Sequence, residues 1–220
     1  MGQWIKITAS DGHEFSAWQA GEGPGLVVIQ EIFGVNGHIR NTVERFADQG
    51  FNAVAPALFD RIGPGLELGY ESEDVARGRE LRGQVSNEDA LLDISAAADL
   101  LSVDGRKVGC VGYCWGGSLA WAGATQPTKF SAAVGYYGGE IAKTADATPN
   151  CPVMLHFGET DHAIPMSDVE TVIAAQPDMP IYIYPAGHGF SCDERESFDP
   201  ASDEVALSRT LSFLKVYLGR

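Results

Sequence analysis

The chain contains the sequence Val111-Gly112-Tyr113-Cys114-Trp115-Gly116-Gly117. Glycine two residues before and two residues after a nucleophile lets the backbone turn sharply from a strand into a helix, because larger side chains would clash in the turn. Residues 107–111 have the apolar pattern of such a strand, and residues 117–122 that of the helix. The sequence therefore predicts a nucleophile elbow with sulfur in place of oxygen. Cys114 would project beyond the end of a sheet, at a helix N-terminus whose dipole favours a thiolate.

Strand and helix patterns alternate along most of the chain. An opening hairpin is predicted at 4–8 and 14–19, and a glycine-rich loop at 60–70 that packs over the sheet edge or the active site. Short apolar runs predict buried strands at 25–29, 52–55, 107–111, 132–136, 152–157 and 181–184. Helices are predicted at 37–49, 73–82, 87–101, 167–175 and 203–218. This order predicts one α/β domain over 1–220, with a mostly parallel sheet covered by helices on both faces.

Composition narrows the class of partner. The 220 residues carry a formal net charge of -15, which argues against nucleic acid and anionic membranes as partners. If the substrate is an anion, local arginines must overcome this field. No signal peptide and no membrane-spanning apolar run is visible, so the four cysteines are expected to be reduced thiols in the cytoplasm. No metal site is expected, since no second cysteine pair at zinc spacing accompanies Cys110 and Cys114.

A nucleophilic cysteine needs a base, and the base needs an orienting acid. His188 lies between glycines in a loop after a strand and before the last helix, which is where the base falls in the order nucleophile, acid, histidine. Asp161 follows the strand that ends at Phe157, from where a carboxylate can reach the imidazole and fix its tautomer. Asp168 and Asp193 are competing acids, and His162 is the rival base. The remaining histidines are expected to be structural: His13, His38 and His156.

The oxyanion produced by attack needs two N–H donors. One should be the backbone N–H of Trp115, directly after the nucleophile. The other should come from the loop after the strand 25–29, where the N–H of Ile32 is the candidate. Glu31 in the same loop is unusual, because a carboxylate at the end of a buried strand is costly unless it is paired. Loop amides would satisfy it in the simplest interpretation.

Together these features resemble the dienelactone hydrolase family, a cysteine branch of the α/β-hydrolase fold. The resemblance covers nearly the whole chain and rests on blocks in the same order: Gln30-Glu31-Ile32-Phe33-Gly34-Val35-Asn36, Gly112-Tyr113-Cys114-Trp115-Gly116-Gly117, Ala133-Val134-Gly135-Tyr136-Tyr137-Gly138, Asp161-His162 and Ala186-Gly187-His188-Gly189-Phe190. The family opens carboxymethylenebutenolides, lactones made during catechol breakdown. The resemblance implies a Cys114–His188–Asp161 triad with Glu31 as the resting hydrogen-bond partner of the thiol.

One position departs from the family pattern. The family binds the substrate carboxylate with arginines, one of them four residues beyond the catalytic histidine, where this chain has Cys192. Arg195 is the nearest replacement, and the helix with Arg77, Arg79 and Arg82 holds a second candidate. The residues expected to bind substrate are Arg77, Arg79, Arg195, Phe33 and Tyr137.

The sequence thus predicts a hydrolase without cofactor that opens a lactone or activated ester. Carboxylesterase or thioesterase chemistry on the same triad is the first alternative. A thiol-sensing or ligand-binding protein, in which Cys114 and Cys192 form a redox pair, is the second. For the predicted hydrolase, the expected partner is a small lactone or ester substrate. The family resemblance alone suggests that the protein is a monomer.

Overall fold

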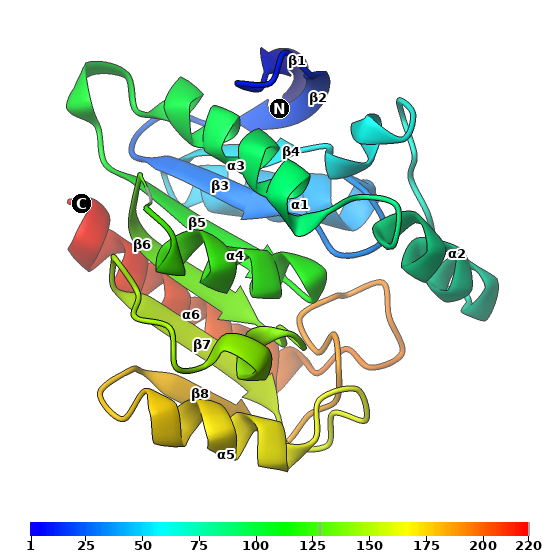
Figure 1. Ribbon diagram of the computed structural model, residues 1–220, viewed down its shortest axis with the longest axis vertical. Coiled ribbons are helices and arrows are strands. Elements are labelled where there is room, and N and C mark those ends of the chain that lie inside the picture. Colours follow the sequence, from blue (N-terminus) through cyan, green and yellow to red (C-terminus); the bar gives the residue numbers. More distant parts are fainter. Residues whose placement is uncertain (128, 220) are drawn as a thin grey trace.

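The strands form an eight-stranded sheet in the order β1-β2-β4-β3-β5-β6-β7-β8 (Figure 1). The protein is seen in a computed structural model that describes residues 1–127 and 129–219. The strands in chain order are β1 (Gln3–Thr8), β2 (Glu14–Ala20), β3 (Gly25–Ile29), β4 (Asn52–Pro56), β5 (Val108–Tyr113), β6 (Phe130–Tyr136), β7 (Val153–Gly158) and β8 (Ile181–Tyr184). The predicted hairpin β1–β2 is antiparallel, as is the pair β2–β4, whereas every neighbouring pair from β4 to β8 is parallel. The carboxyl ends of the central strands therefore meet at one edge.

Helices cover both faces of this sheet. They are α1 (Gly37–Asp48), α2 (Ser72–Arg82), α3 (Asn87–Leu101), α4 (Trp115–Thr125), α5 (Met166–Ala175) and α6 (Pro200–Leu218). Figure 1 shows α3, α4 and α5 on one face, α1 and α6 on the other, and α2 beyond the carboxyl end of β3. Short 3-10 turns occupy Leu58–Arg61, Val103–Gly105 and Ile141–Thr144. In the described part of the chain, no helix has both the length and the apolar character to cross a membrane.

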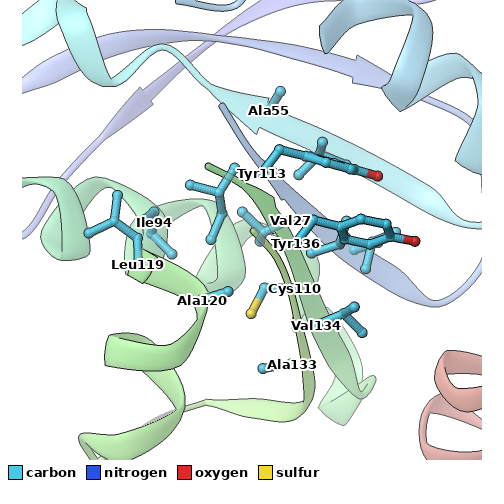
Figure 2. Packing of buried hydrophobic residues seen from close by; sticks show 14 of the residues in the cluster. Val27, Ala55, Ile94, Cys110, Tyr113, Leu119, Ala120, Ala133, Val134 and Tyr136 are labelled. Carbon is cyan, nitrogen blue, oxygen red and sulfur yellow. The ribbon is translucent and has the colours of Figure 1, made fainter. Parts of the chain in front are cut away.

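The core lies on both sides of β5 and β6 (Figure 2). Cys110 and Ala133 are register partners on the face toward α4, where small side chains let the helix approach the sheet. Tyr113 and Tyr136 are partners on the opposite face, and the Tyr136 hydroxyl lies 2.7 Å from Thr210 Oγ1 of α6. Burial on both faces explains why these strands read as continuous apolar runs.

Two segments refine the sequence prediction. The loop 60–70 packs over the active-site side, where the N–H of Leu68 donates to the carbonyl of Phe33. Helix α6 begins at Pro200, three residues earlier than predicted, because the Asp199 side chain caps it by accepting the N–H of Ser202 at 2.7 Å.

Candidate active site

Cys114 occupies a sharp turn between β5 and α4, as the glycine pattern predicts. Its backbone has φ 55° and ψ -114°, a strained conformation for a residue other than glycine. A Cβ on Gly112 would lie 1.9 Å from the carbonyl oxygen of Gly116, and one on Gly116 would lie 2.3 Å from that of Ile29. Glycine is thus required at both positions by close backbone approach. The turn holds the sulfur at the carboxyl edge of the sheet.

Three side chains form a hydrogen-bonded relay at this edge. His188 Nε2 lies 3.2 Å from Cys114 Sγ, and His188 Nδ1 lies 2.8 Å from Asp161 Oδ2. The second carboxylate oxygen of Asp161 accepts the backbone N–H groups of Ala163 and Ile164, at 2.8 and 3.1 Å. These two donors hold the carboxylate in one orientation, so that Oδ2 is directed at the imidazole. The structure therefore brings together the three residues that the sequence singled out.

The relay changes the proton affinity of His188. Burial opposes its charged form, but attraction to the Cys114 sulfur and the hydrogen bonds to Asp161 and Cys114 outweigh burial and raise the pKa of His188 to about 10. The ring of Tyr137 lies against the imidazole, with centroids 5.2 Å apart. His188 is therefore well suited to take the thiol proton.

A cavity of about 380 Å³ opens beside Cys114 and His188. Ile32 and Trp115, the residues predicted to supply the oxyanion hole, are both in its wall, as are Phe33, Arg79 and Arg195. His162 also lines it, whereas the sequence placed its ring on the far side of Asp161. Sequence reasoning did not assign a role to other wall residues: Val75, Arg82, Ser118, Gly139, Glu140, Ala163 and Ile164.

Two predicted substrate-binding residues lie elsewhere. Arg77 faces solvent and pairs with Glu80 at 2.6 Å, because two residues of helix place it about 200° around the axis from Arg79. Arg82, three residues beyond Arg79, is on the cavity side instead. Tyr137 is fully buried behind His188 and is absent from the cavity wall among the described residues. We therefore assign Tyr137 to positioning of the imidazole.

Positive charge gathers in the cavity despite the acidic chain. Arg82 pairs with Glu140 at 2.8 Å and its guanidinium lies 5.5 Å from the ring centre of Trp115. Arg195 approaches Glu31, with 3.7 Å between Nη1 and Oε1. Among the residues that the structure describes, Arg79 has no ion-pair partner. Arg79 is thus the guanidinium most available to an anionic ligand.

Glu31 has different partners from those expected. Within the described chain the structure shows no hydrogen bond from the Cys114 thiol to Glu31, because the sulfur is engaged by His188. Glu31 is completely buried, and its Oε2 accepts a long hydrogen bond of 3.4 Å from the hydroxyl of Tyr70. In this state the polar contacts of the carboxylate come from Tyr70 and Arg195, both at long distance, and among the described residues none comes from a loop amide or from Cys114.

Cys192 is buried close to Glu31. Burial, followed by the nearby Glu31 carboxylate, raises the pKa of the Cys192 thiol to about 12. Glu31, His38 and Cys192 form a buried cluster of side chains that are all able to ligate a metal. The sequence did not reveal this cluster, because its members are separated along the chain and His38 appeared to be a structural residue at a helix start.

The parallel sheet, the elbow and the relay define an α/β hydrolase. The model of the dienelactone hydrolase family matches residues 12–218, and the chain belongs to that family. A Synechocystis protein named "Putative carboxymethylenebutenolidase" is 39% identical over 198 residues, which are 81% of this chain and 80% of that protein. Carboxymethylenebutenolidase 1 of Cupriavidus pinatubonensis is 33% identical over 96% of this chain and 95% of its own length.

A solved structure supports the same assignment. The crystal structure of a "Putative Dienelactone Hydrolase" from Klebsiella pneumoniae superimposes with a TM-score of 0.86 at 29% identity, covering 99% of both chains. The match over 99% of both chains shows that the two proteins share the overall fold. This protein is therefore a hydrolase of that family.

Proposed function

We propose that the protein opens a lactone or activated ester through Cys114. The observation that carries this proposal is the continuous relay from Asp161 through His188 to the Cys114 sulfur, placed at the wall of a cavity. A nucleophile within hydrogen-bond reach of a base, which is itself oriented by an acid, is the arrangement that acyl transfer requires.

The chemistry follows from the positions of the groups. His188 takes the proton of Cys114, and the thiolate attacks the acyl carbon. The N–H groups of Ile32 and Trp115 would hold the oxyanion while the ring C–O bond breaks. The enolate leaving group takes the proton from His188. Water activated by the same imidazole then hydrolyses the thioester and restores the thiol. A thiolate nucleophile works best on a substrate with a good leaving group, because the thiolate is itself easily expelled from the tetrahedral intermediate.

The cavity favours a compact anionic substrate. Its volume of about 380 Å³ is near the lower end for small-molecule sites. Arg79 can bind a carboxylate without first losing a partner, and Arg195 lies on the same wall. A carboxymethylenebutenolide, which combines an enol lactone with one carboxylate, fits this description, and catechol breakdown is the pathway that the family resemblance suggests. The four free thiols suit a cytoplasmic enzyme.

The size of the cavity separates this substrate from the alternatives. A long acyl thioester would extend well beyond this cavity of about 380 Å³, so thioesterase activity is expected to be weak. A small neutral ester should be accepted, but without the contribution of Arg79. A preference for the anionic lactone over 4-nitrophenyl acetate is therefore expected in kcat/KM.

The test is hydrolysis of cis- and trans-dienelactone, followed by absorbance, beside 4-nitrophenyl acetate. Cys114→Ala should lower turnover of every substrate by about a thousandfold or more. Cys151→Ala is the matched control, because Cys151 precedes β7 at the opposite end of the strands and should leave turnover unchanged. Mass spectrometry after rapid quenching should show the acyl group on Cys114. Lactone turnover that survives in Cys114→Ala would contradict the proposal.

A further inference from the structure

A second group of buried reactive side chains lies beside the active site. Glu31 follows β3, His38 is the second residue of α1, and Cys192 lies in the loop between His188 and α6. Their exposed fractions are 0%, 4% and 0%. One ligand atom from each, a carboxylate oxygen, an imidazole nitrogen and a thiol sulfur, lies within 4.8 Å of the other two. The fold thus brings three chemically different donors to one point away from solvent.

The imidazole of His38 is held ready for a ligand. Its Nδ1 lies 2.9 Å from Asp193 Oδ1, and in a neutral ring this carboxylate would hold the proton on Nδ1 and leave the lone pair on Nε2. Nε2 is buried and has no hydrogen-bond partner in the described part of the chain. A buried polar atom without a partner destabilises the folded state. A carboxylate on one imidazole nitrogen, with the other left free, is the usual support for a metal-binding histidine.

The carboxylate is similarly incomplete. Glu31 Oε1 is buried and accepts no hydrogen bond from the described residues. Its neighbour is Arg195, whose Nη1 lies 3.7 Å away. Among the described residues, Oε2 has only the long contact of 3.4 Å with the Tyr70 hydroxyl. The unpartnered buried atoms of His38 and Glu31 therefore suit a ligand that accepts electron pairs from both.

We propose that Glu31, His38 and Cys192 form a binding site for Zn²⁺ or a similarly borderline divalent cation. Oxygen, nitrogen and sulfur donors together are a donor set that zinc accepts. Tetrahedral zinc with bonds of about 2.0–2.3 Å separates its ligands by about 3.3–3.8 Å, so the donors need to move by only about 1 Å. The metal takes the sulfur as thiolate, and the Cys192 proton leaves to solvent. A thiolate and a carboxylate then balance the two positive charges.

Arg195 is the group that opposes this binding. Its guanidinium faces Glu31 from the cavity side, and a cation on Glu31 would have to displace it. Displacement would release Arg195 toward the substrate cavity, so metal binding is coupled to the active site through one side chain. Removing the charge with Arg195→Gln should therefore tighten metal binding by about tenfold.

The test titrates Co²⁺ and Zn²⁺ into the full-length protein, with no dependence on hydrolysis. Cys114→Ser is the reference background, because Cys114 and His188 could themselves bind a thiophilic metal. In that background one equivalent of Co²⁺ should give a thiolate-to-cobalt charge-transfer band, and Zn²⁺ should displace it. Asp193→Asn should weaken Zn²⁺ binding by about 10–100-fold, since it removes the support of His38.

Cys192→Ser and His38→Gln identify the ligands. Cys192→Ser should abolish the charge-transfer band, and both should weaken Zn²⁺ binding by at least about a hundredfold. Cys151→Ser is the matched thiol control and should bind as the reference does. Circular dichroism of each variant checks the fold without metal. A charge-transfer band and an unchanged Zn²⁺ affinity when Cys192→Ser is added to the Cys114→Ser background, or no stoichiometric binding in that background itself, would overturn the proposal.

Discussion

The orientation of Asp161 makes Asp161→Asn a sharp perturbation of the relay. In the protein one carboxylate oxygen accepts the N–H groups of Ala163 and Ile164, and the other accepts the Nδ1 proton of His188. An asparagine has a single side-chain oxygen. If that oxygen stays with the two backbone donors, the amide nitrogen faces His188 and donates to Nδ1. The imidazole proton then sits on Nε2, and the ring cannot accept the proton of Cys114.

The alternative amide orientation is costly. Turning the oxygen toward His188 would place an NH₂ group against two backbone donors, in a site where the Asp161 side chain is 1% exposed. Two buried donors without acceptors cost about 2–6 kcal/mol in total. The unproductive orientation therefore dominates, and kcat should fall by about 10³–10⁴-fold, the range for a catalytic imidazole held in the wrong tautomer. Loss of the carboxylate should also shift the pKa of His188 downward from about 10.

The assay is kcat and kcat/KM for dienelactone and 4-nitrophenyl acetate between about pH 6 and 9. Nitrogen NMR of the His188 ring should report the change of tautomer directly. Asp168→Asn is the matched control, since this competing acid lies in the first turn of α5 and outside the relay. The reasoning would be refuted by Asp161→Asn activity within tenfold of the unmodified protein. It would equally be refuted by a similar loss in Asp168→Asn.

Three further outcomes follow from the geometry. Arg79→Ala should raise the KM for the anionic lactone by about 10–100-fold and leave the KM for the neutral ester unchanged. Arg77→Ala should change neither KM, and equal effects of the two substitutions would contradict the assignment of Arg79 to the substrate. Gly112→Ala should reduce the free energy of unfolding by about 3 kcal/mol or more in chemical denaturation, because its Cβ would lie 1.9 Å from a carbonyl oxygen, and a loss below about 1 kcal/mol would count against the turn. Burial lowers the pKa of His156 to about 3, so its contribution to stability is complete above its unfolded pKa near 6.5 and declines as the pH falls toward 3. Between pH 7 and pH 5 the free energy of unfolding of the unmodified protein should fall by about 2 kcal/mol more than that of His156→Gln. If the two proteins lose stability in parallel over this range, His156 does not have this role.

The elbow and the relay could be predicted because local sequence determines them. Glycines around Cys114 specify the turn, and the ends of consecutive parallel strands specify where Asp161 and His188 must meet. The arginines of α2 were harder to assign, because Arg77, Arg79 and Arg82 all lie on a mostly exposed helix without an apolar stripe that would fix its rotation. Only the packed structure shows that the side with Arg79 and Arg82 turns toward the cavity.

Glu31 shows a second limit of sequence reasoning. Its burial was predicted from its position after an apolar strand. Its partners come from distant segments, because Tyr70 reaches it from the loop before α2 and Arg195 from the loop before α6. No local pattern connects these residues. For the same reason the cluster with His38 could be recognised only after α1 and the loop of Cys192 were brought together.

The position of Cys192 links the substrate and metal proposals. The family resemblance implies an arginine there, and its replacement suggested a loss of positive charge at the substrate. Arg195 supplies a guanidinium to the same cavity from three residues further along, and lies 5.8 Å from the ring centre of Phe33. It can lie there because residue 189 is glycine, whose missing Cβ would be 2.7 Å from Nη1 of Arg195. The loop therefore still supplies a positive charge to the cavity, from Arg195 and not from position 192, so an anionic substrate remains the expectation. The thiol that takes the vacated position faces Glu31 and is available for a different ligand.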